Sequence, residues 1–233
     1  MRGLYVTGTD TGVGKTVVCG LLAGFLRARG IRAATQKWVQ TGAGGQASDL
    51  SAHRRWMRLP EASPAELADL CPYRFALPAS PHLAAAREGK VVEAAVIEGA
   101  YRRIAASHDI VLVEGTGGFL VPLAEGLLAG DLVARLGLSA LVVVGNRLGC
   151  INHALLTVEA IRGRGVPLAG LLFNRLPAHG ESASEEALAD NVRVVGKLSG
   201  VRVLGELPYL AAPAAGAAAI AAAGRAFLEG WRP

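Results

Sequence analysis

A glycine-rich turn near the start of the chain constrains the fold more than any other segment. The apolar run Leu4-Tyr5-Val6 leads into Gly8-Thr9-Asp10-Thr11-Gly12-Val13-Gly14-Lys15-Thr16, and an apolar helical pattern follows at once. A strand, a glycine turn and a helix in this order direct several backbone N–H groups, and the positive end of the helix dipole, at one point. Because Lys15 adds an ammonium and Thr16 a hydroxyl, the segment predicts a cradle for the phosphates of a nucleoside triphosphate.

The spacing and the charges of this phosphate loop indicate which class of nucleotide-binding protein the chain belongs to. Five residues separate Gly8 from Gly14, where the usual pattern has four, so the loop is a stretched variant. The alternative is a glycine turn that precedes a helix by chance. Partition-type ATPases carry a second lysine five residues before the Gly-Lys lysine, and Asp10 stands at that position here. The loop therefore favours a metabolic enzyme over a cytoskeletal switch.

The length and composition of the chain predict one large α/β domain over residues 1–233. Of the residues, 52% are hydrophobic, which predicts a sizeable core. The three cysteines, Cys19, Cys71 and Cys150, form no Cys-x-x-Cys pair, which suits a reducing cytoplasm. No leader pattern and no run of about 18 apolar residues is present, so we expect no membrane association. The net charge of +5 comes from scattered basic residues, which favours small anionic substrates over nucleic acid.

Apolar strands alternate with amphipathic helical segments along the chain. We expect strands at 4–8, 32–39, 110–114, 141–145, 168–174 and 202–207, and helices at 15–29, 47–58, 91–106, 152–164 and 184–196. Ser48 is a candidate N-cap, and the apolar tail 210–223 is expected to be a packing helix. Continuous apolar strands between helices predict a mostly parallel sheet flanked by helices on both faces, as in phosphate-loop NTPases.

Polar residues at the ends of these strands are the site candidates, because ligands bind at the carboxyl edge of a parallel sheet. Glu114 ends an apolar strand and could face Mg²⁺ beside the phosphate loop, or only cap the strand. Lys37 could point its ammonium into the same crevice, or be solvated. Asp49, judged on position alone, is a first-turn helix acid.

Other chemistries have no pattern in the sequence. The five histidines lack metal-ligand spacing, and His153 near a helix start is expected to be structural. No Gly-x-Ser-x-Gly elbow is present, which leaves serine hydrolysis unsupported. Cys150 is expected to be a small apolar residue and not a nucleophile.

The motifs together resemble the dethiobiotin synthetase family over residues 4 to about 210. The resemblance rests on the phosphate loop and on Gln36-Lys37-Trp38-Val39, Ser80-Pro81-His82, Val113-Glu114-Gly115-Thr116-Gly117-Gly118, Leu148-Gly149-Cys150-Ile151-Asn152-His153 and Gly205-Glu206-Leu207-Pro208. It implies a cyclo-ligase of biotin synthesis that converts 7,8-diaminopelargonate, CO₂ and ATP into dethiobiotin, ADP and phosphate. A carbamate forms on one amine, ATP phosphorylates it, and the second amine closes the ureido ring.

The resemblance also implies roles for individual residues. Lys37, Lys15 and Thr11 are the implied catalytic residues, and Mg²⁺ is held by Thr16, Asp49 and Glu114. The implied nucleotide contacts are Gly12, Val13, Gly14, Lys15, Thr16, Val17, Asp49, Glu114, Gly115, Thr116, Gly117, Asn174, Glu206, Leu207 and Pro208. The implied substrate contacts are Thr41, Gly117, Gly149, Cys150 and Asn152. Since the Gly149–Asn152 segment comes from the partner subunit in the family, a homodimer is implied.

Four positions depart from the family pattern. Trp38 replaces a frequent proline, Gly12 an occasional glutamate and Arg175 an occasional acid, while Ala212 lies near a position that can carry a nucleotide-contacting glutamate.

The sequence also leaves two rival functions open. A cobyrinate-type amidotransferase would need a glutamine-hydrolysing domain, for which 233 residues leave little room. A partition-type switch is disfavoured by Asp10.

Overall fold

The computed structural model describes residues 3–42, 44, 46–177, 183–209 and 217–230. The strands are β1 (Gly3–Gly8), β2 (Ala33–Lys37), β3 (Val39–Thr41), β4 (Tyr73–Phe75), β5 (Ile110–Gly118), β6 (Pro122–Ala124), β7 (Leu127–Leu128), β8 (Ser139–Asn146), β9 (Leu168–Arg175) and β10 (Val203–Leu207). The helices are α1 (Lys15–Arg27), α2 (Ser48–Trp56), α3 (Pro64–Leu70), α4 (Pro81–Arg87), α5 (Ala94–Ser107), α6 (Ala129–Arg135), α7 (Cys150–Arg162), α8 (Glu185–Ser199) and α9 (Ala217–Gly230).

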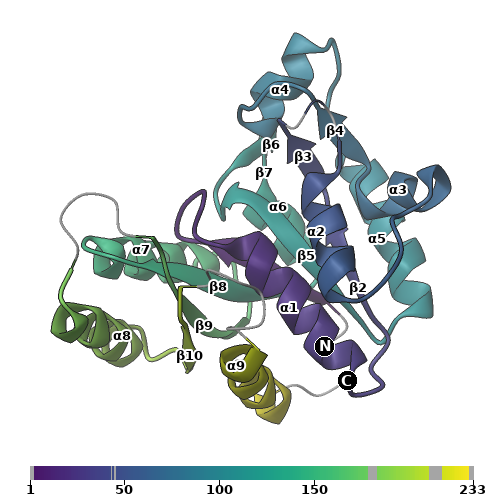
Figure 1. The fold of residues 1–233 in the computed structure, drawn as a ribbon. Helices are drawn as coiled ribbons and strands as arrows, with labels where there is room; N and C mark the ends of the chain where they lie inside the picture. The colour runs from purple at the N-terminus through teal and green to yellow at the C-terminus, as the bar shows by residue number, and fades with distance from the viewer. Residues whose placement is uncertain (1–2, 43, 45, 178–182, 210–216, 231–233) are drawn as a thin grey trace.

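A six-stranded sheet in the order β10-β9-β8-β1-β5-β2 forms the centre of the molecule (Figure 1). Each neighbouring pair in it is parallel. Such a sheet buries both faces, which is why its strands are almost continuously apolar. The expected parallel α/β architecture is confirmed.

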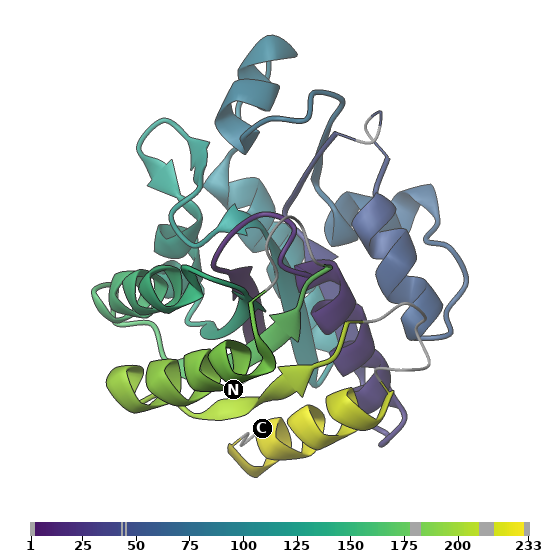
Figure 2. The same cartoon turned by 60° about the vertical axis from the view of Figure 1, so that its left-hand side comes forward.

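Side chains that alternate along β5 divide the core into two layers. Val111 and Val113 pack toward α5 and α7, and Ile110 and Leu112 pack toward α1. Successive residues of a strand point to opposite faces, so one strand contributes to both layers. Helix α9 covers the same face as α1, through Phe227 among others (Figure 2).

The borders of several elements differ from those expected. Residues 32–39 were expected as one strand, but Trp38 separates β2 from the short strand β3, which pairs with β4. Strand β5 continues to Gly118 and does not end at Glu114. The N-cap of α2 is Ala47, without a side-chain hydrogen bond, so the expected cap at Ser48 is wrong. Helix α3 and strand β4 lie between residues 60 and 81, where no helix or strand was expected.

The apolar tail forms a helix later in the chain than expected. Helix α9 runs over Ala217–Gly230, with Ile220 and Ala223 buried. The first part of the expected helix, residues 210–216, lies outside the described residues, as does Ala212. Within the described ranges, no helix is long and apolar enough to cross a bilayer.

Candidate active site

The phosphate loop joins β1 to α1 at the carboxyl edge of the sheet. Its last glycine, Gly14, adopts a left-handed conformation with φ of 94°, and α1 starts directly after it at Lys15. A side chain could not fit at Gly14, because a Cβ would lie 2.3 Å from Nδ2 of Asn174. That amide nitrogen donates a hydrogen bond to the Val13 carbonyl at 2.9 Å. Asn174, expected beside the nucleotide, thus packs on the loop itself.

Lys15 folds back over the loop. Its Nζ donates to the carbonyl oxygen of Asp10 at 2.8 Å, and only 6% of the residue is exposed. Burial and the nearby Lys37 ammonium lower the pKa of Lys15 to about 8. The Lys15 ammonium therefore holds its proton less tightly than an exposed lysine does. A bound anion such as a phosphate would stabilise the protonated form.

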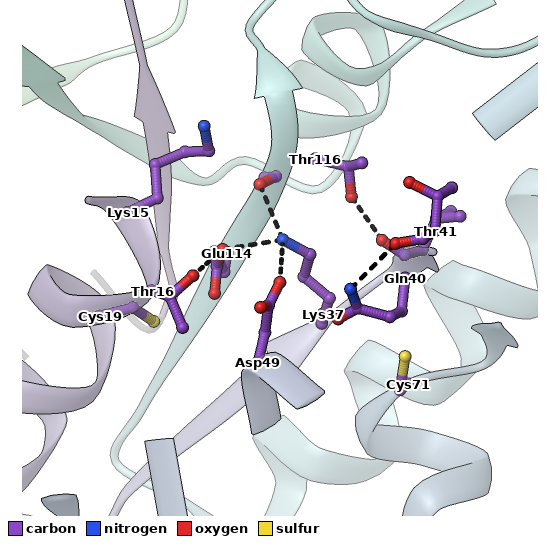
Figure 3. A network of polar contacts seen from close by, with 12 residues as sticks. Lys15, Thr16, Cys19, Lys37, Gln40, Thr41, Asp49, Cys71, Glu114 and Thr116 are labelled. Atoms are coloured by element: carbon purple, nitrogen blue, oxygen red, sulfur yellow. Dashed lines mark hydrogen bonds and ion pairs between the residues drawn. The ribbon is translucent and has the colours of Figure 1, made fainter. Parts of the chain in front are cut away.

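Lys37 occupies the centre of a buried cluster of charges (Figure 3). Its Nζ lies 2.8 Å from Oε1 of Glu114 and 2.8 Å from Oδ2 of Asp49, and it donates to the Gly115 carbonyl at 3.1 Å. Thr16 donates from its hydroxyl to the same Glu114 oxygen at 2.9 Å. Residues from α1, β2, α2 and β5 thus meet at one point beside the phosphate loop.

The charges in this cluster stabilise one another. Burial alone would lower the pKa of Lys37, but Glu114 and Asp49 outweigh burial and raise it. Burial alone would raise the pKa of Glu114, but the Lys37 ammonium and His53 lower it to about 2. At neutral pH, Lys37 is an ammonium and Glu114 a carboxylate.

The oxygen atoms of this cluster fit a magnesium ion. The Thr16 hydroxyl and the carboxylates of Asp49 and Glu114 are hard ligands, and the Lys37 ammonium already stands as a cation between the two carboxylates. No three His, Cys, Asp or Glu side chains of the described residues form a metal cluster. Two carboxylates and a hydroxyl are nevertheless enough for Mg²⁺, which usually keeps several waters and takes other ligands from phosphates.

The loop after β5 and the strand β3 lie next to this cluster. The Thr116 hydroxyl donates to the carbonyl oxygen of Val39 on β3, which ties this loop to the strand that carries Thr41. At Gly117, a Cβ would lie 3.9 Å from the hydroxyl of Thr11, so the phosphate loop faces the loop after β5. The structure thus brings Thr11, Thr41, Thr116 and Gly117 to the same edge of the sheet.

At the ends of β8, β9 and β10, Glu206 belongs to a polar network. Its Oε1 accepts from Nδ2 of Asn146 at 2.6 Å, and its Oε2 lies 3.2 Å from Nε of Arg175. Arg175 also pairs with Glu185 at 2.6 Å. Leu207, next in the chain, is fully buried. Both Glu206 oxygens thus have protein partners in this structure.

The segment expected to bind substrate starts α7. Gly149 is the N-cap residue with φ of 85°, Cys150 is buried and Asn152 is exposed. No hydrogen bond or ion pair between described residues joins Cys150 or Asn152 to the Lys37 cluster. Within the described part of one chain, these two groups of predicted residues therefore make no direct polar contact.

Comparison with known proteins places this arrangement in a family. The model of an AAA domain family, AAA_26, matches residues 2–215. The ATP-dependent dethiobiotin synthetase BioD of Chlorobaculum tepidum is 42% identical over 82% of this chain and 78% of its own length. A protein of the same name from Anaeromyxobacter sp. is 45% identical, over 84% of this chain and 87% of its own length. The chain belongs to the dethiobiotin synthetase family.

Two solved structures of cell division proteins have a fold similar to that of this chain. The MinD cell division protein of Aquifex aeolicus superposes with a TM-score of 0.63 at 13% identity, covering 100% of this chain and 99% of its own. The cell division ATPase MinD of Pyrococcus furiosus gives 0.60 at 15% identity, over 98% of each chain. At these identities, the likeness of this chain to the MinD proteins shows the fold alone.

Two contacts of the site, made by His53 and by Arg147, were not predicted from the sequence. His53 lies at Glu114, with Nε2 2.8 Å from Oε2. Arg147 lies 2.8 Å from Asp10 and joins the loop before α7 to the phosphate loop. His53 follows Asp49 by four residues, which places both on one helix face, and this spacing was the available signal. No local pattern pairs Arg147 with Asp10.

Proposed function

We propose that this chain, acting as one synthetase domain, closes the ureido ring of dethiobiotin from 7,8-diaminopelargonate, CO₂ and ATP. The observation that carries the proposal is the Lys37 ammonium, buried between Asp49 and Glu114 directly beside a phosphate loop. The names of relatives at 42–48% identity support the same reaction.

The reaction needs two anions to meet. One amine of the substrate attacks CO₂ and loses a proton, which gives a carbamate. A carbamate oxygen then attacks the γ-phosphorus of ATP, so ADP leaves and a carbamic-phosphoric anhydride forms. The second amine attacks the carbonyl carbon, loses a proton and expels phosphate. Because the second step joins a carbamate to a γ-phosphate, the enzyme has to supply positive charge at that point.

Lys37 and Lys15 are the proposed sources of this charge, and the Thr11 hydroxyl is proposed to act with them. Lys37 stands at the carboxyl end of β2, and Glu114 and Asp49 keep its ammonium protonated. Lys15 reaches the phosphates from the first turn of α1. Lys37 would leave one of its carboxylates to meet the carbamate, while Lys15 would leave the Asp10 carbonyl to meet the phosphates.

Thr16, Asp49 and Glu114 are the proposed ligands of Mg²⁺. When bound with ATP, the ion neutralises negative charge on the phosphates during transfer. Glu114 is suited to this role because its carboxylate stays ionised at neutral pH and the fold fixes its place at 2% exposure. The remaining nucleotide contacts expected from the sequence, in the phosphate loop, after β5 and at the ends of β9 and β10, are part of the same proposal.

A homodimer with shared substrate sites is a further part of the proposal. Asn152 and Leu156 are four residues apart on α7, so they share one face of the helix, and Leu148 lies in the turn just before it. All three are exposed, and the two leucines are 67% and 55% exposed. Exposed apolar residues that lie together are typical of a partner surface. In this dimer, the start of α7 would supply Gly149 and Asn152 to the partner's site.

The proposed location is the cytoplasm. Cys19, Cys71 and Cys150 are all free and buried in the described structure. Burial raises the pKa of each of these thiols. Unpaired cysteines are typical of proteins that work in a reducing compartment.

Phosphate release tests the proposed reaction directly. The protein is incubated with ATP, bicarbonate and Mg²⁺, with and without 7,8-diaminopelargonate, and the products are identified by mass. We expect phosphate release that depends on the diamine, with one dethiobiotin formed for each phosphate. Phosphate release that does not depend on the diamine would instead favour a nucleotide switch. Full activity in excess chelator would refute the metal site.

A further inference from the structure

His53 is a buried polar residue to which the proposed reaction gives no role. It is 0% exposed and lies on α2, one helical turn after Asp49. Its Nε2 is 2.8 Å from Oε2 of Glu114. Helix α2 therefore contacts both members of the central ion pair, Lys37 through Asp49 and Glu114 through His53.

The two oxygens of the Glu114 carboxylate have different neighbours. Oε1 accepts the hydroxyl of Thr16 and the ammonium of Lys37, at 2.9 and 2.8 Å. Oε2 lies at ion-pair distance from Nε2 of His53. Neither this Oε2 nor this Nε2 makes an aligned hydrogen bond to any described residue. His53 is thus the polar group that meets the free side of this carboxylate.

A role limited to filling space does not account for an imidazole at this position. Both ring nitrogens are buried without an aligned hydrogen bond in the described structure, and such burial is unfavourable. An apolar side chain of similar size would fill the same volume without this cost. The close approach of α2 also depends on Gly20 of α1, where a Cβ would lie 3.1 Å from the Cα of His53.

We propose that His53 is a positioning residue of the cation site. It holds the Glu114 carboxylate in the orientation in which Oε1 meets Thr16 and Lys37, and it thereby sets the affinity for the divalent cation that accompanies the nucleotide. This inference rests on the proposed magnesium ligands. Groups that orient a metal ligand typically contribute about 10- to 100-fold to metal affinity.

Binding of Mn²⁺ in the presence of ADP tests this role without relying on turnover. Free Mn²⁺ is followed by electron paramagnetic resonance in the unsubstituted protein and in His53→Leu and His53→Gln. We expect His53→Leu to bind Mn²⁺ about 10- to 100-fold more weakly. His53→Gln keeps an N–H near the position of Nε2, so it should recover most of this loss. His108→Leu, which removes a histidine at the end of α5, should bind Mn²⁺ normally.

Thermal unfolding without metal separates positioning from packing. A His53→Leu protein that unfolds at an unchanged or higher temperature, with weakened Mn²⁺ binding, supports the positioning role, because leucine removes only polarity. Unchanged Mn²⁺ affinity in His53→Leu overturns the proposal, and so does a glutamine variant that binds as weakly as the leucine variant. Glu114→Gln tests the metal ligand itself. If that variant binds Mn²⁺ normally, the proposed metal site fails together with the role of His53.

Discussion

Lys37 has a cationic side chain whose partners in the described structure are all protein atoms. Its ammonium contacts Asp49, Glu114 and the Gly115 carbonyl and is almost fully buried. To meet a carbamate, it has to exchange one of these contacts for the substrate. The carboxylate that Lys37 leaves then becomes available to the metal ion. The substrate carbamate would then balance the charge of Lys37, and the metal ion would balance that of the carboxylate.

Substituting Lys37 should separate chemistry from nucleotide binding. We expect Lys37→Gln to lower kcat about 10²- to 10³-fold, as the loss of one preorganised donor typically does. ADP affinity, measured by calorimetry, should change little because Lys15 and the loop remain. Lys90→Gln is the control, since Lys90 is an exposed surface lysine. A normal kcat in Lys37→Gln would remove its catalytic role.

The substitution Lys37→Gln should also lower the free energy of unfolding. Losing one partner of a buried ion pair leaves the other charge uncompensated, which costs about 3–5 kcal/mol. Turnover of Lys37→Gln therefore has to be compared at a temperature where denaturant unfolding shows both proteins to be native.

Nucleotide binding should depend on pH through Lys15. Its pKa of about 8 lies below the ordinary lysine value because of burial and the Lys37 ammonium. Above pH 8 the free protein loses this proton, whereas bound phosphates favour the ammonium, so binding takes up a proton. The Kd for ADP should rise between pH 8 and 9.5, by at most about tenfold per pH unit. Calorimetry in two buffers of different ionisation heat measures this uptake; a constant Kd would contradict it.

At the scale of elements, the contact between α1 and α2 determines whether the site can form. Helix α1 carries Lys15 and Thr16, and α2 carries Asp49 and His53. The two helices approach closely at Gly20, where a Cβ would lie 2.2 Å from the ring of Trp56. A larger residue there would push α2 away from Glu114.

Gly20→Ala tests this helix contact. Alanine favours a helix over glycine by about 1 kcal/mol, but overpacking a rigid contact costs about 1–3 kcal/mol. We expect a net loss of up to about 2 kcal/mol in the free energy of unfolding, together with weaker Mn²⁺ binding. Gly99→Ala in α5 is the matched control, because its Cβ would meet only the flexible end of Arg103. Urea unfolding should show Gly99→Ala to be more stable than the parent, and an equally stabilised Gly20→Ala would refute the argument.

The sequence predicts these elements well where apolar periodicity is strong, and poorly elsewhere. Apart from polar residues at their ends, strands β8 and β9 are apolar, so they lie within one or two residues of the expected positions. The break at Trp38 was not predictable, because its indole donates to Gln36 and packs on Tyr5, and these contacts exist only in the folded chain. Glu114 and Lys37 were candidates because strand ends carry chemistry, but their ion pair joins residues 77 positions apart in the sequence and has no local signal.

At the scale of the whole molecule, the proposed dimer links assembly to activity. Asn152 lies on an exposed face of α7, between Leu148 and Leu156. No hydrogen bond or ion pair of the described residues joins this face to the Lys37 cluster. In the proposed dimer, the second copy brings the start of α7 to the site, so activity and assembly should be lost together.

Asn152→Trp should damage diamine binding through this interface. We expect KM for the diamine to rise at least about tenfold, as for the loss of a buried contact worth about 1.4 kcal/mol. Sedimentation should show a weakened dimer. A tryptophan at exposed Arg102 of α5 is the control. A stable monomer of the parent protein with full activity would refute the shared site.

The order of strands in the sheet has a consequence for synthesis. Strand β1 is made first, but its neighbours are β5 and β8, which begin at Ile110 and Ser139. The next strand made, β2, pairs with β5 and not with β1. At about 5–20 residues per second, the ribosome needs roughly 5–20 s to reach β5 after finishing β1. During that time, the apolar segment that leads into the phosphate loop is a nascent strand without a partner, and shielding it from aggregation falls to the ribosome surface and to chaperones.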